Sequence, residues 1–340
     1  SAPGLTATGR ITTREGGGLD TARFSSVQAG DWLDAEVVLT GAGRGNAVDI
    51  AVTGGSLDIR KLPGGDGGLD AGGGSPLALR LDRLIVSDGI SFTDFRGAFG
   101  QNGGLNGRFS ASVNGQGAVN GAVAPAAGGT AIRITSDNAG TVMAAADIFD
   151  KGRGGTLDMT LVPRGPAGHY DGRATFSRLR VQDAPGLAEL LSAISVVGLL
   201  EQLNGEGLAF NNGEMNFILT PDAVEITQGS AVGASLGISF AGLYRSAGKE
   251  LALQGVISPI YLVNGIGAIF SRRGEGMFGF NYSLTGTADD PVVSVNPLSI
   301  FTPGRRLATA SVFMPMRRRF CSEMTGEAWP ATASVEAASS

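Results

Sequence analysis

Short stretches in which apolar and polar residues alternate dominate the first half of the chain. They cover residues 35–40, 47–52, 57–60, 77–81 and 84–86, and each is bounded by Gly, Asp, Asn or Pro. Alternation with a period of two places every second side chain on one face of a β-strand. The bounding residues are typical of turns. The even spacing predicts an antiparallel meander, which we expect to continue over 108–123, 131–162 and, with one bulge, 173–181.

The second half of the chain continues this alternation over 214–219, 223–227, 234–243 and 251–257. One face of these strands is predicted to be apolar, and its residues are Val224, Ile226, Leu236, Ile238, Phe240, Leu251, Leu253 and Ile257. The opposite face carries small or polar residues, among which Ser235 and Ser239 are expected inside a strand. The dry face of such a sheet must be covered by a second sheet, by helices or by an apolar ligand.

Two short amphipathic helices are predicted near the C-terminal end. For the first, over 183–204, Asp183 is the expected N-cap, Pro185 lies in the first turn and Gly205 ends the helix. Its apolar stripe consists of Leu187, Leu190, Leu191, Ile194 and Val197. The second covers 259–271, and its apolar face consists of Leu262, Ile266, Ile269 and Phe270. A further helical turn is possible over 144–149. These helices can cover only a small part of so long a sheet.

Repeated glycine pairs divide the alternating stretches. The sequence at 54–59 recurs at 154–159 with irregular spacing, which we interpret as similar turns that begin strands. Residues 61–76 are expected to form a flexible loop. We therefore expect a repetitive β region over 1–182, a helix over 183–204, a second β region over 205–304, and a basic, disordered tail over 305–340.

Composition and charge exclude several classes of protein. The chain has 55 glycines but 42% hydrophobic residues, which is not a disorder signature. Its net charge of −5 gives no general attraction to nucleic acid. One cysteine forms no internal disulfide, and one histidine with one cysteine makes no metal cluster. No metal or cofactor is predicted.

Enzymatic motifs are weak. Residues 233–237 spell a nucleophile elbow around Ser235, but His169 precedes it in the chain, whereas that fold needs its histidine downstream. The glycine-rich segment 64–70 has the wrong spacing for a calcium-binding turn. We predict no catalytic residue and no enzymatic activity.

The region from 251 onward resembles a known family. Residues 258–264, 286–291, 295–299 and 303–304 are similar to the C-terminal region of the AsmA-like proteins, in particular the YhdP type of Gram-negative envelope proteins. The positions that carry the resemblance are Pro259, Asn264, Gly286, Pro291, Asn296 and Pro297. The resemblance implies a long curled β-sheet with an apolar trough that spans the periplasm and conducts phospholipid between the inner and outer membranes.

The resemblance also sets expectations about location and partners. No signal peptide opens the sequence, so an exported protein would be a fragment, anchored to the inner membrane by an N-terminal segment absent from this chain. Residues 251–271 are better explained by a strand and a helix than by a membrane span. An envelope protein is a possible further partner. Headgroup phosphates would be met by Arg272, Arg273, Arg305 and Arg306, although the last two could equally belong to a solvated tail.

Alternatives remain open for the helices and for the function. Helix 183–204 would plug the sheet or touch lipid as an interfacial element. Helix 259–271 would be a fixed lid or a gate that opens to deliver lipid. The alternative function is a non-enzymatic envelope scaffold or outer-membrane assembly factor with a closed β core.

Overall fold

The computed structural model describes residues 4–15, 17–41, 48–62, 75–100, 103–259, 279–288 and 290–296. These residues form one 17-stranded sheet and three short α-helices. The strands are β1 (Leu5–Thr13), β2 (Leu19–Ala29), β3 (Leu33–Thr40), β4 (Asp49–Asp58), β5 (Leu77–Ser87), β6 (Ile90–Gly100), β7 (Asn106–Val113), β8 (Gly117–Ala126), β9 (Gly129–Ser136), β10 (Gly152–Pro163), β11 (Tyr170–Val181), β12 (Leu208–Leu219), β13 (Ala223–Gly233), β14 (Leu236–Arg245), β15 (Glu250–Pro259), β16 (Phe280–Thr287) and β17 (Pro291–Asn296).

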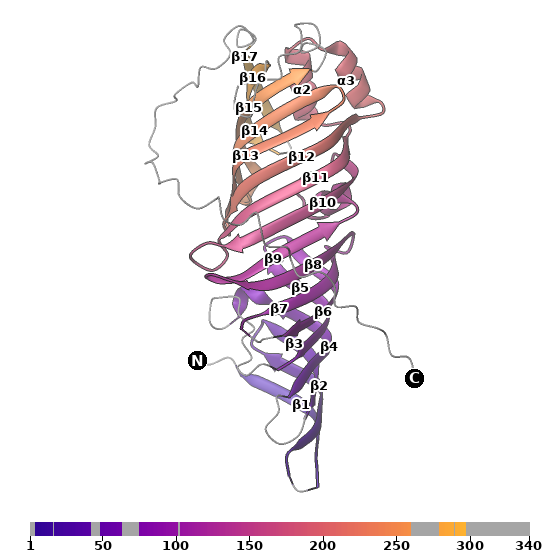
Figure 1. The fold of residues 1–340 in the computed structure, drawn as a ribbon, viewed down its shortest axis with the longest axis vertical. Helices are drawn as coiled ribbons and strands as arrows, with labels where there is room; N and C mark the ends of the chain where they lie inside the picture. The colour runs from indigo at the N-terminus through magenta and orange to yellow at the C-terminus, as the bar shows by residue number, and fades with distance from the viewer. Residues whose placement is uncertain are drawn as a thin grey trace. The chain divides into compact units, whose positions relative to one another are not determined.

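Each strand pairs with the next strand of the chain, from β1 to β17 (Figure 1). The predicted mainly β, curled antiparallel sheet is confirmed, with one exception: β4 and β5 run parallel. A parallel pair cannot be joined by a tight turn, because the chain must return to the same end of the sheet. The connection over 59–76 therefore has to be long. The prediction of a flexible loop over 61–76 falls mostly outside the described residues.

The three α-helices lie in two of the connections between consecutive strands, β9 to β10 and β11 to β12. The α-helices are α1 (Ala139–Ala145), α2 (Pro185–Ala193) and α3 (Val197–Asn204), and the 3-10 helices are η1 (Ile59–Lys61) and η2 (Ala247–Lys249). Helix α1 starts earlier than the helical turn predicted over 144–149, because the Asn138 side chain caps it by accepting the Thr141 N–H at 3.1 Å. Strand β11 pairs directly with β12, so the sheet continues across the insertion of α2 and α3.

The single helix predicted over 183–204 is two helices, and this part of the prediction is wrong. Ser195 has a φ of +58°, which breaks the helix between α2 and α3. The break follows from local chemistry: Ile194, Val196 and Val197 are β-branched and weak helix formers, and serine competes for backbone hydrogen bonds. Ala184, not Asp183, is the N-cap. The change of direction turns Val197 outward, where it is 64% exposed.

The two longer glycine repeats lie inside strands and are not turns that begin strands. Gly55 in β4 and Gly154 and Gly155 in β10 have positive φ values of +104°, +63° and +76°. A positive φ interrupts the regular ladder and bends the strand. The slip in alternation within 173–181 occurs at Arg178, whose φ is +54°, but it is not the predicted bulge. Neither Arg178 nor Gly155 has a partner in the register of β10 with β11, which is the same on both sides of this position, so no strand carries an extra residue. The segment expected as a strand over 57–60 instead ends β4 and forms η1, while 77–81 and 84–86 join into β5.

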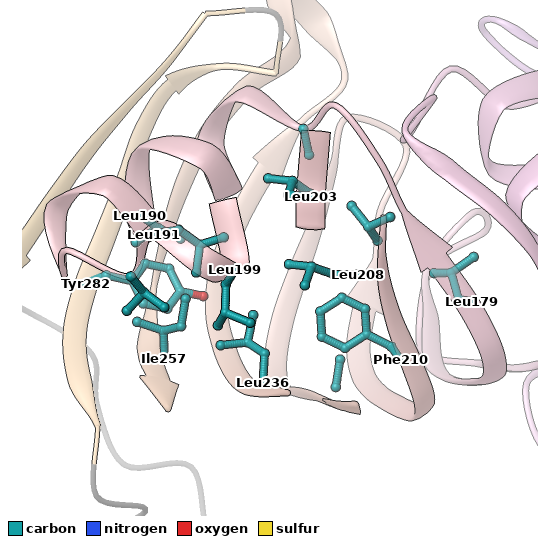
Figure 2. Close-up of a cluster of buried hydrophobic side chains, with 14 of the residues drawn as sticks. Leu179, Leu190, Leu191, Leu199, Leu203, Leu208, Phe210, Leu236, Ile257 and Tyr282 are labelled. Carbon is teal, nitrogen blue, oxygen red and sulfur yellow. The ribbon is translucent and has the colours of Figure 1, made fainter. Parts of the chain in front are cut away.

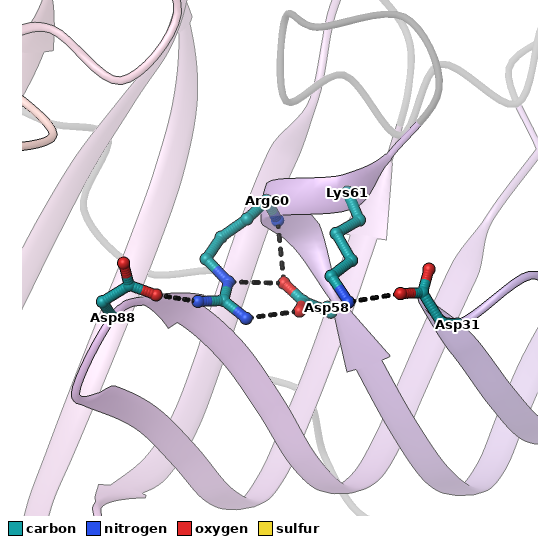
Figure 3. Close-up of polar contacts among 5 residues, drawn as sticks. All are labelled: Asp31, Asp58, Arg60, Lys61 and Asp88. Carbon is teal, nitrogen blue, oxygen red and sulfur yellow. Dashed lines mark hydrogen bonds and ion pairs between the residues drawn. The ribbon is translucent and has the colours of Figure 1, made fainter.

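An ion-pair network fixes the start of the parallel connection (Figure 3). Asp58 is 5% exposed and accepts the Arg60 backbone N–H at 3.1 Å and the Arg60 guanidinium at 2.6 and 2.8 Å. Arg60 also pairs with Asp88, and Lys61 pairs with Asp31. The hydrogen bonds from the Arg60 side chain hold the pKa of the Asp58 carboxyl below its usual value.

Asp58→Asn is expected to lower the free energy of unfolding by about 1–3 kcal/mol at neutral pH, because a neutral amide weakens the bond to the Arg60 guanidinium. Since the folded pKa is the lower one, the carboxylate contributes fully above the unfolded pKa of about 4, and this contribution is lost as pH falls through the folded pKa. Urea unfolding between about pH 7 and pH 2 should show the difference between the two proteins shrinking.

Asp88→Asn is the matched control for this experiment. The Asp88 side chain is fully exposed, so its ion pair with Arg60 is screened by solvent and its loss should leave stability nearly unchanged. A difference between wild type and Asp58→Asn that is the same at every pH would contradict the proposed role of the carboxylate charge.

Candidate functional site

The strand registers place all eight predicted apolar residues on one face of the sheet. Ile238 lies opposite Ile257, Leu236 lies opposite Pro259, and Phe240 lies opposite Gly255. Further along these strands, Tyr244 of β14 lies between Leu251 of β15 and Val224 of β13. Gly242 of β14 lies in the same way between Leu253 of β15 and Ile226 of β13. We call this side of the sheet the apolar face and the other side the polar face.

The apolar face carries no charge over a long distance. The registers of β9–β17 give its described positions, and none of them is Asp, Glu, Lys, Arg or His. Besides the eight predicted residues, this face includes Ile132, Ile134, Leu157, Met159, Met215, Leu219, Tyr244, Tyr282, Leu284, Val293 and Val295. Their alternation was visible in the sequence, but only the register shows that they share a face with the predicted set.

Phenylalanine side chains lie over glycines of the neighbouring strand. Phe240 covers Gly229, and Phe217 covers Gly172; a Cβ atom built on either glycine would come within 2.2 or 2.3 Å of the ring. Phe176 covers Gly213 in the same way. A ring that occupies the space of a missing side chain lies close to the backbone. These pairs therefore keep the apolar face shallow while still covering the glycine backbone.

Helices α2 and α3 cover one end of the apolar face (Figure 2). Leu191 and Leu203 from the helices are 0% exposed, as is Ile257 below them, and Leu236 is 2% exposed. The Tyr282 hydroxyl donates to the Ser239 carbonyl at 3.0 Å, and burial raises the pKa of Tyr282 above its usual value. The predicted stripe residues Leu190 and Leu191 are buried, Leu187 and Ile194 are partly buried, and Val197 is not part of the packed surface.

A second packed region fills the apolar face at the N-terminal half. The rings of Phe92, Phe95, Phe99 and Phe109 pack together with centroid distances of 5.1–6.4 Å; three of the ring pairs are stacked, and Phe92 is tilted against Phe109. Leucines of β5 and Val142 of α1 complete this cluster. In this region protein side chains occupy the apolar face, so it is a conventional dry core.

Between these two packed regions, the apolar face is only partly covered. Six of the eight predicted residues are partly exposed, namely Val224, Ile226, Ile238, Phe240, Leu251 and Leu253. The same holds for Leu157, Met159, Met215, Leu219 and Leu284. Because 4.8 Å separates neighbouring strands, this stretch from β10 to β16 is about 29 Å long.

The polar face of the same strands shows ordinary surface chemistry. Arg133 pairs with Asp158 at 2.5 Å, and the hydroxyls of Thr156 and Ser177 lie 2.7 Å apart. A shallow concavity of about 570 Å³ lies here, lined by residues of β9–β13 such as Glu214. Among the residues that the structure describes, no group of three or more His, Cys, Asp or Glu side chains could hold a metal ion.

The sequence suggested that Ser235 lies inside a strand, but the structure places it in the turn between β13 and β14. Its hydroxyl is 3.5 Å from the Gln202 amide oxygen. His169 lies in the turn between β10 and β11, where its ring contacts the Ala167 carbonyl at 3.2 Å. No hydrogen bond joins Ser235 to His169 among the described contacts, and the two do not form a nucleophile–base pair.

Several predicted residues lie outside the described residues: Leu262, Asn264, Ile266, Ile269, Phe270, Arg272, Arg273, Pro297, Arg305 and Arg306. The helix predicted over 259–271 and the tail over 305–340 lie there too. Of the other family positions, Pro259 ends β15, Gly286 has a φ of +94° opposite Pro291, and Asn296 ends β17. In the described part of the chain, no helix is both long and apolar enough to cross a membrane.

Comparison of the chain with protein-family models, with curated proteins and with solved structures gave no match. The resemblance to the AsmA-like proteins therefore rests on the sequence motifs alone.

Proposed function

We propose that this chain binds phospholipid acyl chains along the partly exposed apolar face of β10–β16 and conducts them as part of a bridge between the inner and outer membranes of a bacterial envelope. The observation that carries the proposal is the uncharged apolar face, which has partly exposed apolar side chains on each of the seven strands β10–β16. Leu161, Ala174 and Phe217 on the same stretch are buried in a small cluster. A contiguous apolar surface of this kind, on a sheet whose other face is polar, favours an apolar occupant.

The dimensions and energetics suit an acyl chain. The stretch of about 29 Å exceeds the length of one acyl chain, since half of a bilayer's ~30 Å hydrocarbon core is about 15 Å. Each methylene that leaves water gains about 0.8 kcal/mol. Leucine, isoleucine, valine, methionine and phenylalanine recur on every strand, so this gain is similar at each step. A lipid can therefore slide along the face without a deep binding well, and no catalytic residue is needed.

The sequence resemblance supports the periplasmic location and the role in outer-membrane biogenesis. Two membrane partners, and a possible envelope protein partner, follow from the same resemblance. In this proposal the headgroups remain in water at the open side of the sheet, while α2 and α3 close one end of the apolar face.

One observation favours the alternative of an envelope scaffold or assembly factor. The phenylalanine stack of β6 and β7 fills the apolar face, so this part of the sheet has a closed core. If the partly exposed stretch were also covered in the cell by another protein, the sheet would bind no lipid along its length.

Mass spectrometry of the purified chain tests the proposal. We expect phospholipids to co-purify in near-stoichiometric amounts after gel filtration in detergent-free buffer and to be removed by organic extraction. A purified, folded protein that carries no lipid and takes up none from phospholipid vesicles would contradict lipid conduction and favour the scaffold.

A further inference from the structure

Three arginines gather on the polar face of β5–β7, opposite the phenylalanine-packed core. Arg80 of β5 pairs directly with Arg96 of β6. Arg96 in turn lies diagonal to Arg108 of β7, because Arg96 pairs with Ser110 and Ala98 with Arg108. All three side chains are exposed. Side chains that are directly opposite or diagonal on one face of a sheet lie about 4.5–8 Å apart.

None of the three arginines forms an ion pair with a residue of the described ranges. The nearest acids on these strands are Asp82 and Asp94. The Asp82 carboxylate accepts the Gly55 N–H at 2.9 Å, and Asp94 lies in a bulge with a φ of +50°. Neither neutralises the arginines by a direct contact.

Several arginines in the C-terminal half of the same polar face have acidic partners within the protein. There Arg133 pairs with Asp158, Arg173 with Glu214, and Arg245 with Glu250. Each of these arginines has a carboxylate on the neighbouring strand, which is the stabilising arrangement for a sheet. Arg153 and Arg180 lie opposite one another, but their guanidinium groups donate to the Gly152 and Glu206 carbonyls. At β5–β7, as at Arg10 and Arg23 of β1 and β2, one arginine lies opposite another, which is destabilising in the absence of an anion, and at β5–β7 a third arginine adjoins the pair.

We propose that Arg80, Arg96 and Arg108 form a binding site for clustered phosphate groups. Guanidinium groups present planar pairs of N–H donors that match phosphate oxygens, and each remains charged at every physiological pH. Two strand spacings separate β5 from β7, about 10 Å, a span over which two or more phosphate groups can each meet a guanidinium fork. The ligand class is thus one with two or more phosphates, or a surface on which phosphate headgroups lie side by side.

This site does not depend on the proposed lipid-conducting face. The arginines lie on the opposite side of the sheet, and β5–β7 lie outside the partly exposed stretch of β10–β16. Loss of phosphate binding would leave the acyl-chain site unchanged, and loss of acyl-chain binding would leave the arginine site unchanged.

Titration calorimetry of the whole chain with inorganic pyrophosphate tests binding of a soluble ligand with two phosphates. Sedimentation with phosphatidylglycerol vesicles tests binding of lipid headgroups, and phosphatidylcholine vesicles serve as the comparison. We expect Arg80→Gln/Arg96→Gln to weaken binding at least about tenfold, because each guanidinium supplies charge-assisted hydrogen bonds. The matched control, Arg173→Gln/Arg245→Gln, removes the same charge from paired positions and should change binding less than about twofold.

The two probes separate the sources of phosphate. Binding of pyrophosphate alone assigns the site to a soluble ligand, and binding of phosphatidylglycerol vesicles alone assigns it to lipid headgroups. Without ligand, Arg80→Gln should raise the melting temperature, because it removes the like-charge pair. An equal loss of binding in the two double variants, or no binding of either probe at low salt, would overturn the proposal.

Discussion

Leu253→Asp is expected to reduce the phospholipid that co-purifies with the chain by at least about tenfold, while the protein stays folded. Leu253 lies on the partly exposed apolar face, midway along β15, and outside the residues that α2 and α3 bury. A carboxylate in contact with an acyl chain loses part of its hydration, which costs several kcal/mol, and each 1.4 kcal/mol corresponds to a factor of ten in binding. Without lipid, the same carboxylate is hydrated from the open side.

Ala252→Asp is the matched control. It adds the same charge one residue earlier on the same strand, but on the exposed polar face. Lipid retention measured by mass spectrometry should remain at the wild-type level in this variant, and circular dichroism should show both variants folded. Equal lipid retention by Leu253→Asp and wild type would exclude this stretch of the face as the acyl-chain site.

Leu203→Ala is expected to lower the free energy of unfolding by about 2–5 kcal/mol. Leu203 belongs to α3, is 0% exposed, and packs in the same cluster as Leu208 and Leu236 at the covered end of the face. Truncation removes buried methyl groups and leaves a cavity that the sheet below cannot fill, because its backbone is fixed by hydrogen bonds to both neighbouring strands. Urea unfolding followed by circular dichroism measures the change.

Val197→Ala provides the comparison on the same helix. Val197 is 64% exposed, so its truncation should change stability by less than about 0.5 kcal/mol. A loss of stability as large as that of Leu203→Ala would mean that α3 packs differently from the arrangement in Figure 2.

The sequence by itself predicted the fold class and the two faces of the sheet. Alternation with period two is a local property, because neighbouring side chains of a strand must point to opposite faces. For this reason Ile238 and Phe240 could be assigned to one face of their strand before any pairing was known, and the register agrees with that assignment. The irregular backbone at Arg178 was visible for the same reason, as a slip in the alternation, although it is not a bulge.

Local sequence patterns gave wrong predictions where one pattern is compatible with two different structures. Glycine pairs are typical of turns, yet Gly154 and Gly155 lie within β10, because a positive φ also serves an irregular position inside a strand. The helix pattern over 183–204 continued through Ser195, and the stripe gave no sign that Val197 would leave the packed surface. Whether a weak helix segment breaks depends on the surface against which its two halves pack.

Only the tertiary structure decided which apolar residues are covered and which are open. Leu236 and Leu253 have the same chemistry and the same face, but α2 and α3 bury the first and leave the second partly exposed. Likewise, the parallel pairing of β4 with β5 and the placement of Arg80 opposite Arg96 depend on contacts between residues distant in the chain. Sequence periodicity fixes the direction of a side chain relative to its own strand; its neighbours are fixed by the pairing of strands, which no local pattern contains.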